Sequence, residues 1–422
     1  MPDFLTDRRR WAVVALLFAA SLINYLDRAS LSLALPTISA ELGLDPTRKG
    51  LLLSAFFWSY ALLQVPVGMC LDRFPIRWFY AGMFALWSLA CGFTGFAGSL
   101  VVFIGLRIVL GIGESIYFPG GAKTVSLLFA AKDRGLPNGL FDSGTRVGLV
   151  AGGVLIPWLI LSFGWRAMFK VLGFGSLLWL VPWLLIVPQR VRPTGVENAP
   201  RSGFRLPTFN RNLLGICLGF FCFDYFVYLL LTWLPDYLMT VRHLTIMKAG
   251  VYSAMPYVIF GSCQALGGWI GDRLVTRGWD ETRTRKGIVT VGFLAGLLLV
   301  PAVRVGNTDV AIGLIMGACL VGLSVGNLTA IVQSCAPADE VGVWIGMENF
   351  LGNFAGILAP VATGLLISRT GSYMPGFTLA AVVLVAGLAP YWLVVGQLKP
   401  PVVTSGFALI SQDQRETRSG NL

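Results

Sequence analysis

The chain has 422 residues, of which 55% are hydrophobic and only 13% charged, and its formal net charge is +11 at pH 7. Soluble domains carry about a quarter charged residues, so this composition excludes an ordinary soluble domain and indicates a membrane protein. The apolar runs are continuous rather than alternating, which argues against a transmembrane β-barrel.

Twelve apolar stretches follow one another, and each is long enough to form a helix across about 30 Å of hydrocarbon. They cover residues 11–37, 51–71, 78–98, 100–130, 136–163, 167–187, 211–240, 247–271, 287–304, 309–334, 341–368 and 374–398. Three arginines precede the first stretch, but we expect no cleaved signal peptide because the apolar run continues past the candidate cleavage site. The sequence therefore predicts an all-α membrane protein with twelve transmembrane helices.

The positive charges are distributed unevenly along the chain. Most of the 32 Lys and Arg residues fall in the N-terminus, in every second loop and in the C-terminal tail. This bias predicts a multi-pass protein of the cell (cytoplasmic) membrane with both termini in the cytoplasm. Topology and contact with the lipid bilayer then explain the positive charge, so no nucleic-acid partner is expected. The seven cysteines lack metal-ligand spacing, and neither a metal nor a cofactor is expected.

Span 1 places an acid and a base, Asp27 and Arg28, in the middle of an apolar run. No other charged residue lies between Arg10 and Glu41, so both side chains lie about 20 Å of helix from either end. Neighbouring helical residues point about 100° apart, so the two cannot easily pair with each other. Ionisable groups at this depth are costly, and they indicate a functional site.

Neutral polar residues accompany this pair in the first two spans. Tyr25 lies one turn before Arg28, while Tyr60 and Gln64 lie one turn apart in span 2. Tyrosine and glutamine side chains could hydrogen-bond the hydroxyl groups of a substrate in a central cavity. Simple packing within the helix bundle is an equal alternative for the tyrosines.

Span 4 carries a second acid and a second base. Arg107 and Glu114 lie seven residues apart, which places them on one face of the helix. Arginine can bind a carboxylate through a two-pronged hydrogen bond, and a carboxylic acid in a partly dry site can take up a proton near neutral pH. The sequence therefore predicts a proton site beside an anion site in the N-terminal half.

Span 5 contains Thr145 and Arg146 in the stretch FDSGTRVG. Arg146 could pair with Asp142 four residues earlier and serve as an anchor or gate near the inner surface. Alternatively, it could face the cavity and bind a second acidic group of the substrate, or suit a bulkier substrate. The sequence leaves both interpretations open.

The chain is built from two similar halves. We predict an N-terminal six-helix bundle over 1–187, a cytoplasmic linker over 188–210, a C-terminal six-helix bundle over 211–400 and a disordered cytoplasmic tail over 401–422. The motif GMCLDR returns 200 residues later as GWIGDR. The shared residues, predicted to form a gating motif, are Gly68, Asp72, Arg73, Gly268, Asp272 and Arg273. Paired bundles of six helices are typical of transporters that rock around a midplane site.

The loop GMCLDRFPIRW resembles the signature loop of the major facilitator superfamily, although Pro75 and Ile76 stand where that family has a glycine and a basic residue. Further stretches narrow the resemblance to the anion:cation symporter family, whose members include sugar-acid carriers and vesicular glutamate transporters. These stretches are INYLDRASLSLALP, FFWSYALLQVPVG, LRIVLGIGESIYFPG, FDSGTRVG, LTWLPDYL and MENFLGNFAGILAPVATG. The resemblance covers both halves, and it implies the major facilitator fold with two pseudo-symmetric bundles.

The resemblance also implies roles for single residues. Arg28 would bind the substrate carboxylate, while Asp27 and Glu114 would load protons outside and release them inside. Arg107 would control the protonation of Glu114 more than it holds substrate. In span 11, Asn349 would contact substrate.

Two further positions leave the substrate open. Asn353 follows Asn349 by one turn, and hydrogen bonding between helices is the alternative for both asparagines. The sugar-acid carriers resembled often have glutamine at the position of Thr145, so the identity of the substrate cannot be taken from them.

We therefore expect a monomeric secondary active transporter, not an enzyme, that carries a small organic anion such as a sugar acid with H⁺. Exchange of organic anions or phosphate esters, coupling to Na⁺, and a transporter-like sensor are the alternative functions. The four buried charges could also form static ion pairs that brace helices 1 and 4.

Overall fold

The computed structural model describes residues 7–129, 133, 135–188, 209–337 and 340–398, and the regular elements within them are all helical. The first group of helices is α1 (Asp7–Leu42), α2 (Pro46–Arg73), α3 (Ile76–Thr94), α4 (Leu100–Glu114), α5 (Tyr117–Leu128), α6 (Gly135–Ser176), η2 (Leu177–Trp179) and α7 (Leu180–Ile186). The second group is α8 (Arg211–Thr240), α9 (Ile246–Thr276), α10 (Glu281–Ala295), η3 (Gly296–Leu298), α11 (Leu299–Arg304), α12 (Thr308–Ala318), η4 (Cys319–Ser324), α13 (Val325–Cys335), α14 (Val341–Thr370), α15 (Met374–Ala386) and η5 (Pro390–Val394).

The predicted spans coincide with these helices. Within the described ranges, eight helical stretches are long and apolar enough to cross a membrane. One of them, Leu136–Ile186, holds both span 5 and span 6, which meet at Gly164 with a φ of +81° that favours glycine. The helices α2, α3 and α9 supply the remaining three predicted spans. The predicted fold class is confirmed: this is a multi-pass, all-helical membrane protein.

Short loops with capping residues separate the long helices. The loop between α1 and α2 is an example, because the Asp45 carboxylate accepts a hydrogen bond from the backbone N–H of Arg48 at 3.0 Å. Pro46 follows as the first helical residue, a position at which its missing N–H costs nothing. Such a cap ends one span and starts the next within a few residues.

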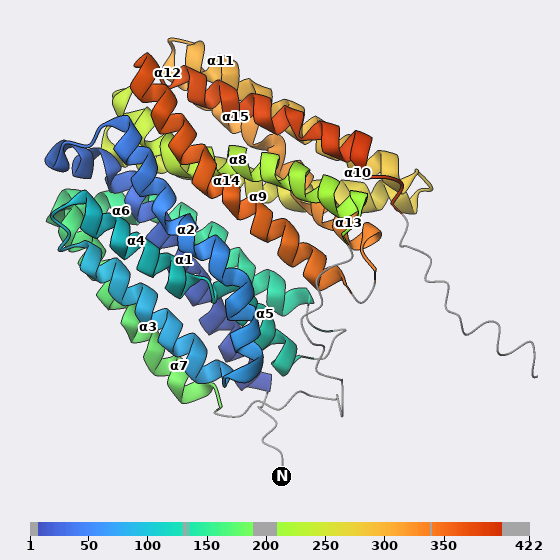
Figure 1. Cartoon of the computed structure of the whole chain (residues 1–422), viewed down its shortest axis with the longest axis horizontal. Helices are drawn as coiled ribbons and strands as arrows, with labels where there is room; N and C mark the ends of the chain where they lie inside the picture. Colours follow the sequence, from blue (N-terminus) through green and yellow to red (C-terminus); the bar gives the residue numbers. More distant parts are fainter. Residues whose placement is uncertain (1–6, 130–132, 134, 189–208, 338–339, 399–422) are drawn as a thin grey trace, which may run out of the picture.

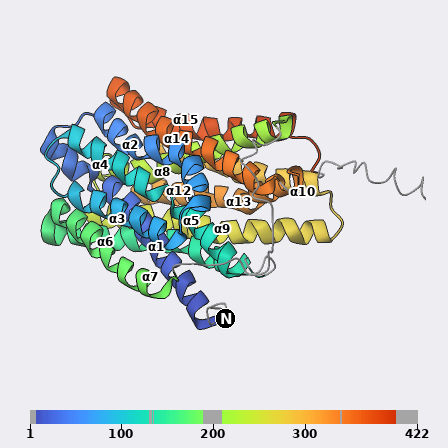
Figure 2. The same cartoon turned by 60° about the horizontal axis from the view of Figure 1, so that its bottom comes forward.

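The two groups of helices lie side by side along two contacts (Figure 1). In the first contact α2 packs against α14, and in the second α6 packs against α9, while α1 touches α8 between them (Figure 2). The second contact is tight because a Cβ atom on Gly153 would collide with Ala254 and with the backbone of Gly250. We call these contacts the α2–α14 seam and the α6–α9 seam.

One end of the α2–α14 seam is closed by a buried ion pair. The Lys49 ammonium at the start of α2 lies 2.9 Å from the carboxylate of Asp236 near the end of α8. The hydroxyl of Tyr373 donates a 2.5 Å hydrogen bond to the second oxygen of that carboxylate. We refer to this side of the molecule as the Lys49 end.

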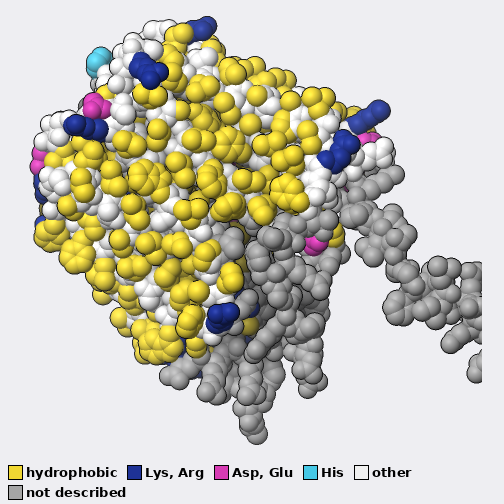
Figure 3. Space-filling view, viewed as in Figure 1, with side chains coloured by type: hydrophobic (Ala, Val, Ile, Leu, Met, Phe, Trp, Pro, Cys, Tyr) yellow, Lys and Arg dark blue, Asp and Glu magenta, His cyan; other side chains and the backbone are white. Residues whose placement is uncertain are grey.

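The surface agrees with a lipid environment. The face shown in Figure 3 is covered largely by apolar side chains, and the charged groups gather at its margins. Of the predicted linker 188–210, only residues 188, 209 and 210 are described, and the predicted tail 401–422 lies outside the described residues.

Candidate functional site

The predicted acid and base of span 1 point in different directions, and each finds a partner on another helix. The Arg28 Nε of α1 lies 3.1 Å from the Glu114 Oε2 at the last residue of α4. The side chains are 6% and 0% exposed, respectively, so this ion pair is almost dry. One Arg28 nitrogen and one Glu114 oxygen keep no hydrogen-bond partner among the described residues.

Asp27 faces α3 instead. The Cys91 thiol donates to Asp27 Oδ1 at 3.1 Å, and Asp27 Oδ2 is buried without a partner among the described residues. Arg107 is 3% exposed, and its guanidinium lies 5.4 Å from the centre of the Phe169 ring. Asp27 interacts electrostatically with both Glu114 and Arg107, so the structure brings the four predicted charges into one cluster.

Aromatic rings surround the Arg28 guanidinium. Its central carbon lies 4.9 Å from the ring centre of Tyr25, 4.7 Å from that of Phe56 and 4.6 Å from that of Tyr60. Cation–π contacts of this kind favour the charged arginine where water is scarce. Tyr25 and Tyr60 were predicted from the sequence, whereas Phe56 was not. Gln64 is half-buried and makes no hydrogen bond to another described residue.

The C-terminal half contributes neutral groups. The Tyr228 hydroxyl of α8 donates to Asn353 Oδ1 of α14 at 2.9 Å, and the Tyr228 ring lies 4.6 Å from the ring of Phe57 of α2 in the first half. Asn353 and Asn349 each donate from their side-chain amide to a backbone carbonyl one turn earlier, at 2.8 and 3.0 Å. Their amide N–H groups are therefore engaged within α14, and for Asn353 the carbonyl is bound to α8.

The span 5 residues separate. Thr145 is 2% exposed and donates its hydroxyl to the Asp142 carbonyl at 2.7 Å, so it is bound within its own helix. Arg146 donates from Nη2 to Gln264 Oε1 of α9 at 3.1 Å, and its guanidinium lies 5.3 Å from the centre of the Phe260 ring. Asp142 still interacts electrostatically with Arg146, but the hydrogen bond of Arg146 runs across the α6–α9 seam to Gln264.

More side chains of the repeated loop motif can be placed in the second half of the chain than in the first. Arg285 lies 3.0 Å from Asp272, whose side chain is 70% exposed, and Arg273 is exposed at the end of α9. A Cβ on Gly268 would only touch Gly326, and a Cβ on Gly68 would meet nothing within 4 Å. In the first half, the side chain of Asp72 lies outside the described residues, and Arg73 is exposed.

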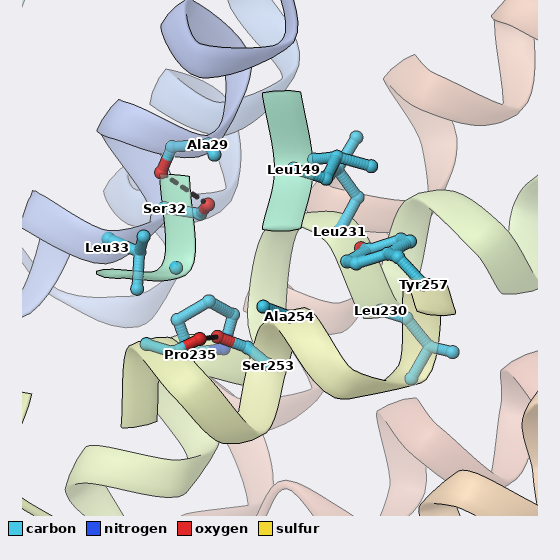
Figure 4. A pocket seen from close by; sticks show the side chains of 12 residues that line it. Ala29, Ser32, Leu33, Leu149, Leu230, Leu231, Pro235, Ser253, Ala254 and Tyr257 are labelled. Atoms are coloured by element: carbon cyan, nitrogen blue, oxygen red, sulfur yellow. Dashed lines mark hydrogen bonds between the residues drawn. The ribbon is translucent and has the colours of Figure 1, made fainter. Parts of the chain in front are cut away.

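A separate small pocket, partly open to solvent, lies between α1, α6, α8 and α9 (Figure 4). None of the predicted site residues lines it. Its wall is mostly apolar, and the hydroxyls of Ser32 and Ser253 donate to carbonyls of their own helices, at 3.1 Å to Ala29 and 2.5 Å to Ala249. The pocket is therefore poorly suited to holding an anion by itself.

Four residues of this region were missed by the sequence interpretation: Phe56, Cys91, Tyr228 and Gln264. The internal repeat offers a signal for two of them, because Tyr228 and Gln264 stand 200 residues after Arg28 and Gln64. Cys91 and Phe56 carry no such signal, since their roles depend on how α3 and α2 are rotated against α1.

Comparison with known proteins places the chain among membrane transporters. The family model of the Major Facilitator Superfamily matches residues 17–360. A probable galactarate/D-glucarate transporter of Bacillus subtilis is 31% identical over 429 residues, which covers 93% of each chain. The D-galactonate transporter of Escherichia coli O6:H1 is 30% identical over 418 residues, which covers 93% of this chain and 97% of that one.

Solved structures share the fold at low sequence identity. A bacterial homologue of the human lysosomal transporter Spinster has a TM-score of 0.78 at 18% identity, covering 92% of this chain and 97% of that one. A D-xylose-proton symporter has a TM-score of 0.72 at 15% identity, covering 92% and 98%.

Proposed function

The chain belongs to the Major Facilitator Superfamily, and on this premise we propose that it is a proton-coupled symporter that carries a sugar acid by alternating access. It is a transporter rather than an enzyme, and relatives that match nearly its whole length are named for galactarate, glucarate and galactonate. A small hydroxylated carboxylate is therefore the proposed substrate class.

The observation that carries this proposal is the dry ion pair between Arg28 and Glu114. A proton on Glu114 would cancel the charge of the carboxylate and leave the Arg28 guanidinium without its counterion. The guanidinium would then be ready to bind an incoming carboxylate through its fork of N–H groups. Binding of the anion and binding of the proton are thereby linked at one pair of side chains.

Asp27 would provide a second proton acceptor in the same cluster. Its Oδ2 atom is buried without a partner among the described residues, and Arg107 lies within electrostatic reach. A negative charge in such a position is costly unless it is neutralised by a cation or a proton. Arg107 would act mainly by controlling how readily Asp27 and Glu114 take up protons, and less by contacting substrate.

The remaining parts of the proposal concern topology. We propose that the protein acts as a monomer and that both of its termini lie in the cytoplasm. With this topology the Lys49 end faces the outside of the cell. Alternating access would then require the ion pair of Lys49 with Asp236 to break as the Lys49 end opens. The coupling ion would be H⁺, and no resident cofactor is involved.

The test is uptake into proteoliposomes that contain the purified full chain. Labelled galactonate, galactarate, a hexuronate and small mono- and dicarboxylates are supplied with and without an inward proton gradient. We expect accumulation of a sugar acid that collapses when a protonophore is added. Gradient-independent uptake that requires an internal anion would instead mean exchange, and accumulation driven only by a sodium gradient would mean Na⁺ coupling.

Two variants and one control assign the proton sites. Asp27→Asn and Glu114→Gln should each abolish proton-driven accumulation, because an amide cannot bind and release the coupling proton. Glu41→Gln is the control, since this carboxylate lies on the same helix as Asp27 but is 43% exposed and pairs with Arg166. If either buried variant still accumulates substrate against a gradient, its assignment as a proton carrier is wrong.

A further inference from the structure

Arg146 is a membrane-embedded cation that the proposed proton and anion site does not use. Its guanidinium contacts the neutral Gln264 and the Phe260 ring. Asp142, one turn earlier on the same helix, interacts electrostatically with Arg146, but no ion pair joins the two among the described residues. A guanidinium inside a helix bundle is expensive unless an anion balances it, and such groups mark the paths of charged ligands. Asp142 is near but not in direct contact, so an anion hydrogen-bonded to the Arg146 guanidinium is a candidate for a group that arrives from solution.

The surroundings of Arg146 repeat those of Arg28. Arg28 lies over the Tyr60 ring of α2, and Arg146 lies over the Phe260 ring of α9, which stands 200 residues later in the repeat. The hydrogen-bond partner of Arg146, Gln264, is likewise the counterpart of Gln64. The two arginines thus contact the same face of two equivalent helices, α2 and α9. Arg28 lies beside the α2–α14 seam, and Arg146 lies in the α6–α9 seam.

The two arginines also lie at different depths. Helices α1 and α6 run parallel, because Gly144 packs against Phe18 and Gly148 packs against Leu22. Arg146 is therefore level with about residue 20 of α1, and Arg28 lies roughly 12 Å farther toward the Lys49 end. The two guanidinium groups are too far apart to bind a single phosphate group together. Each of them could bind one of two separate carboxylates.

Aromatic side chains connect the two positions. The Tyr25 ring lies 4.9 Å from the Arg28 guanidinium, and Tyr257 of α9 lies near Arg146. The Tyr257 hydroxyl is buried without a partner among the described residues, so it can bind a hydroxyl group of a ligand. Tyr25 and Tyr257 thus offer polar groups near the two arginines to a hydroxylated chain.

We propose that the substrate is a dicarboxylate, with one carboxylate bound by Arg28 and the other by Arg146 together with Gln264. This inference rests on the proposed function, because it names the substrate class of the same transport site. Arg146 is a specificity-determining residue in this arrangement, since a monocarboxylate leaves its charge unbalanced. The second carboxylate also takes over a hydrogen bond that now joins the two halves, which links recognition to the α6–α9 seam.

The experiment compares two sugar acids of equal chain length in proteoliposomes containing the full chain. Galactarate has a carboxylate at both ends, and galactonate has a carboxylate at one end and a hydroxyl at the other. We expect the wild type to take up galactarate with the higher kcat/KM. In Arg146→Gln, kcat/KM for galactarate should fall by roughly 10- to 150-fold, the range for losing hydrogen bonds to a charged group, while galactonate changes much less.

Two further variants make the result interpretable. Arg166→Gln removes another arginine from the same helix. It should leave kcat/KM unchanged for both galactarate and galactonate. Arg146→Lys keeps the positive charge without the planar fork and should retain part of the preference for galactarate. If Arg146→Gln does not fold, the ratio of galactarate to galactonate uptake in Arg146→Lys still decides the question: a reduced ratio supports the inference, and an unchanged ratio overturns it.

The outcomes separate this inference from the function on which it rests. Equal losses for both sugar acids in Arg146→Gln, or a wild-type preference for galactonate, would overturn the dicarboxylate inference and leave sugar-acid transport standing. Adipate, the dicarboxylate of the same chain length without hydroxyl groups, is supplied as a third probe. Its uptake in place of galactarate would support two-point binding of a dicarboxylate and overturn the sugar-acid part of the proposed function. If the wild type carries none of these anions, the proposed function fails and this inference fails with it.

Discussion

Breaking the ion pair between Lys49 and Asp236 would test whether this pair holds the two halves together at the Lys49 end. The side chains are 13% and 0% exposed, respectively, and both oxygens of the carboxylate are bound, one by Lys49 at 2.9 Å and one by Tyr373 at 2.5 Å. Asp236→Asn removes the negative charge and keeps the shape of the side chain. The Lys49 ammonium then remains in a nearly dry contact with only neutral partners.

The size of the effect follows from this burial. Removing one partner of a buried ion pair costs about 3–5 kcal/mol, because the other charge stays buried and unpaired. Lys49 keeps a little contact with solvent, so we expect the lower part of that range. A cost of about 3 kcal/mol shifts an equilibrium by roughly 100-fold, in favour of conformations in which the Lys49 end is open and the ammonium is hydrated.

The assay measures how fast a water-soluble maleimide reacts with a cysteine placed at Ser253. This side chain is 7% exposed and lines the pocket between the halves, so its reaction rate reports opening. The native cysteines are first replaced by serine or alanine, and Ser253→Cys is then combined with Asp236→Asn. We expect labelling to become faster by one to two orders of magnitude, in line with the shift of roughly 100-fold in the equilibrium.

Two variants serve as controls. Arg48→Met breaks the neighbouring ion pair with Asp45, whose side chains are 57% and 49% exposed, so it should cost at most about 1 kcal/mol. Combining Lys49→Met with Asp236→Asn should recover much of the slow labelling, because no unpaired charge remains buried. If Asp236→Asn speeds labelling no more than Arg48→Met does, the pair does not hold the halves and the reasoning is refuted.

Three further predictions concern the seams and the repeated loop. Gly153→Val should cost about 1–3 kcal/mol through overpacking of the α6–α9 seam, visible as a lower melting temperature, whereas Gly139→Val on the same helix meets open space and should be neutral. Tyr228→Phe removes the hydrogen bond to Asn353 and should raise the KM for sugar-acid uptake by roughly 10-fold, a loss that an unchanged KM would contradict. Asp272→Asn breaks an ion pair whose carboxylate is 70% exposed and should shift the free energy of unfolding by less than about 1 kcal/mol, measured by thermal melts at low and high salt.

The fold could be predicted from the sequence because hydrophobic length is a sufficient signal for a membrane helix. The weakest spans by composition are α2, α3 and α9, and two of these belong to the seams between the halves. Polar and small residues such as Lys49 and Gly250 are needed there for contact with the other half, and they dilute the apolar signal. The repeat at an offset of 200 residues still identifies α2 and α9 as equivalent helices.

The partners of the buried charges were harder to predict than their depth. The sequence places Asp27, Arg28 and Glu114 deep in the membrane, but the rotation of α1 decides that Arg28 meets α4 and Asp27 meets Cys91 of α3. The same limit applies to Arg146, for which helical spacing favours Asp142. Packing of α6 against α9 instead brings Gln264 within hydrogen-bond distance, and no pattern within one helix can encode a contact of that kind.

The two halves share a fold but differ in chemistry, and this difference bears on how transport is organised. Arg28, Asp27, Arg107 and Glu114 all belong to the first half, together with Arg146. The second half has Tyr228 at the repeat position of Arg28, and its charged groups near this region, the half-buried Asp224 and the buried Glu348, are acids only. The basic groups that would bind an anion therefore lie in the first half, while the second half contacts this region through hydrogen bonds and ring contacts across the seams. A ligand that neutralises both Arg28 and Arg146 would remove the electrostatic cost of burying these two charges. It would also replace the hydrogen bond between Arg146 and Gln264, so ligand binding would act directly on the α6–α9 seam, which has to move during transport.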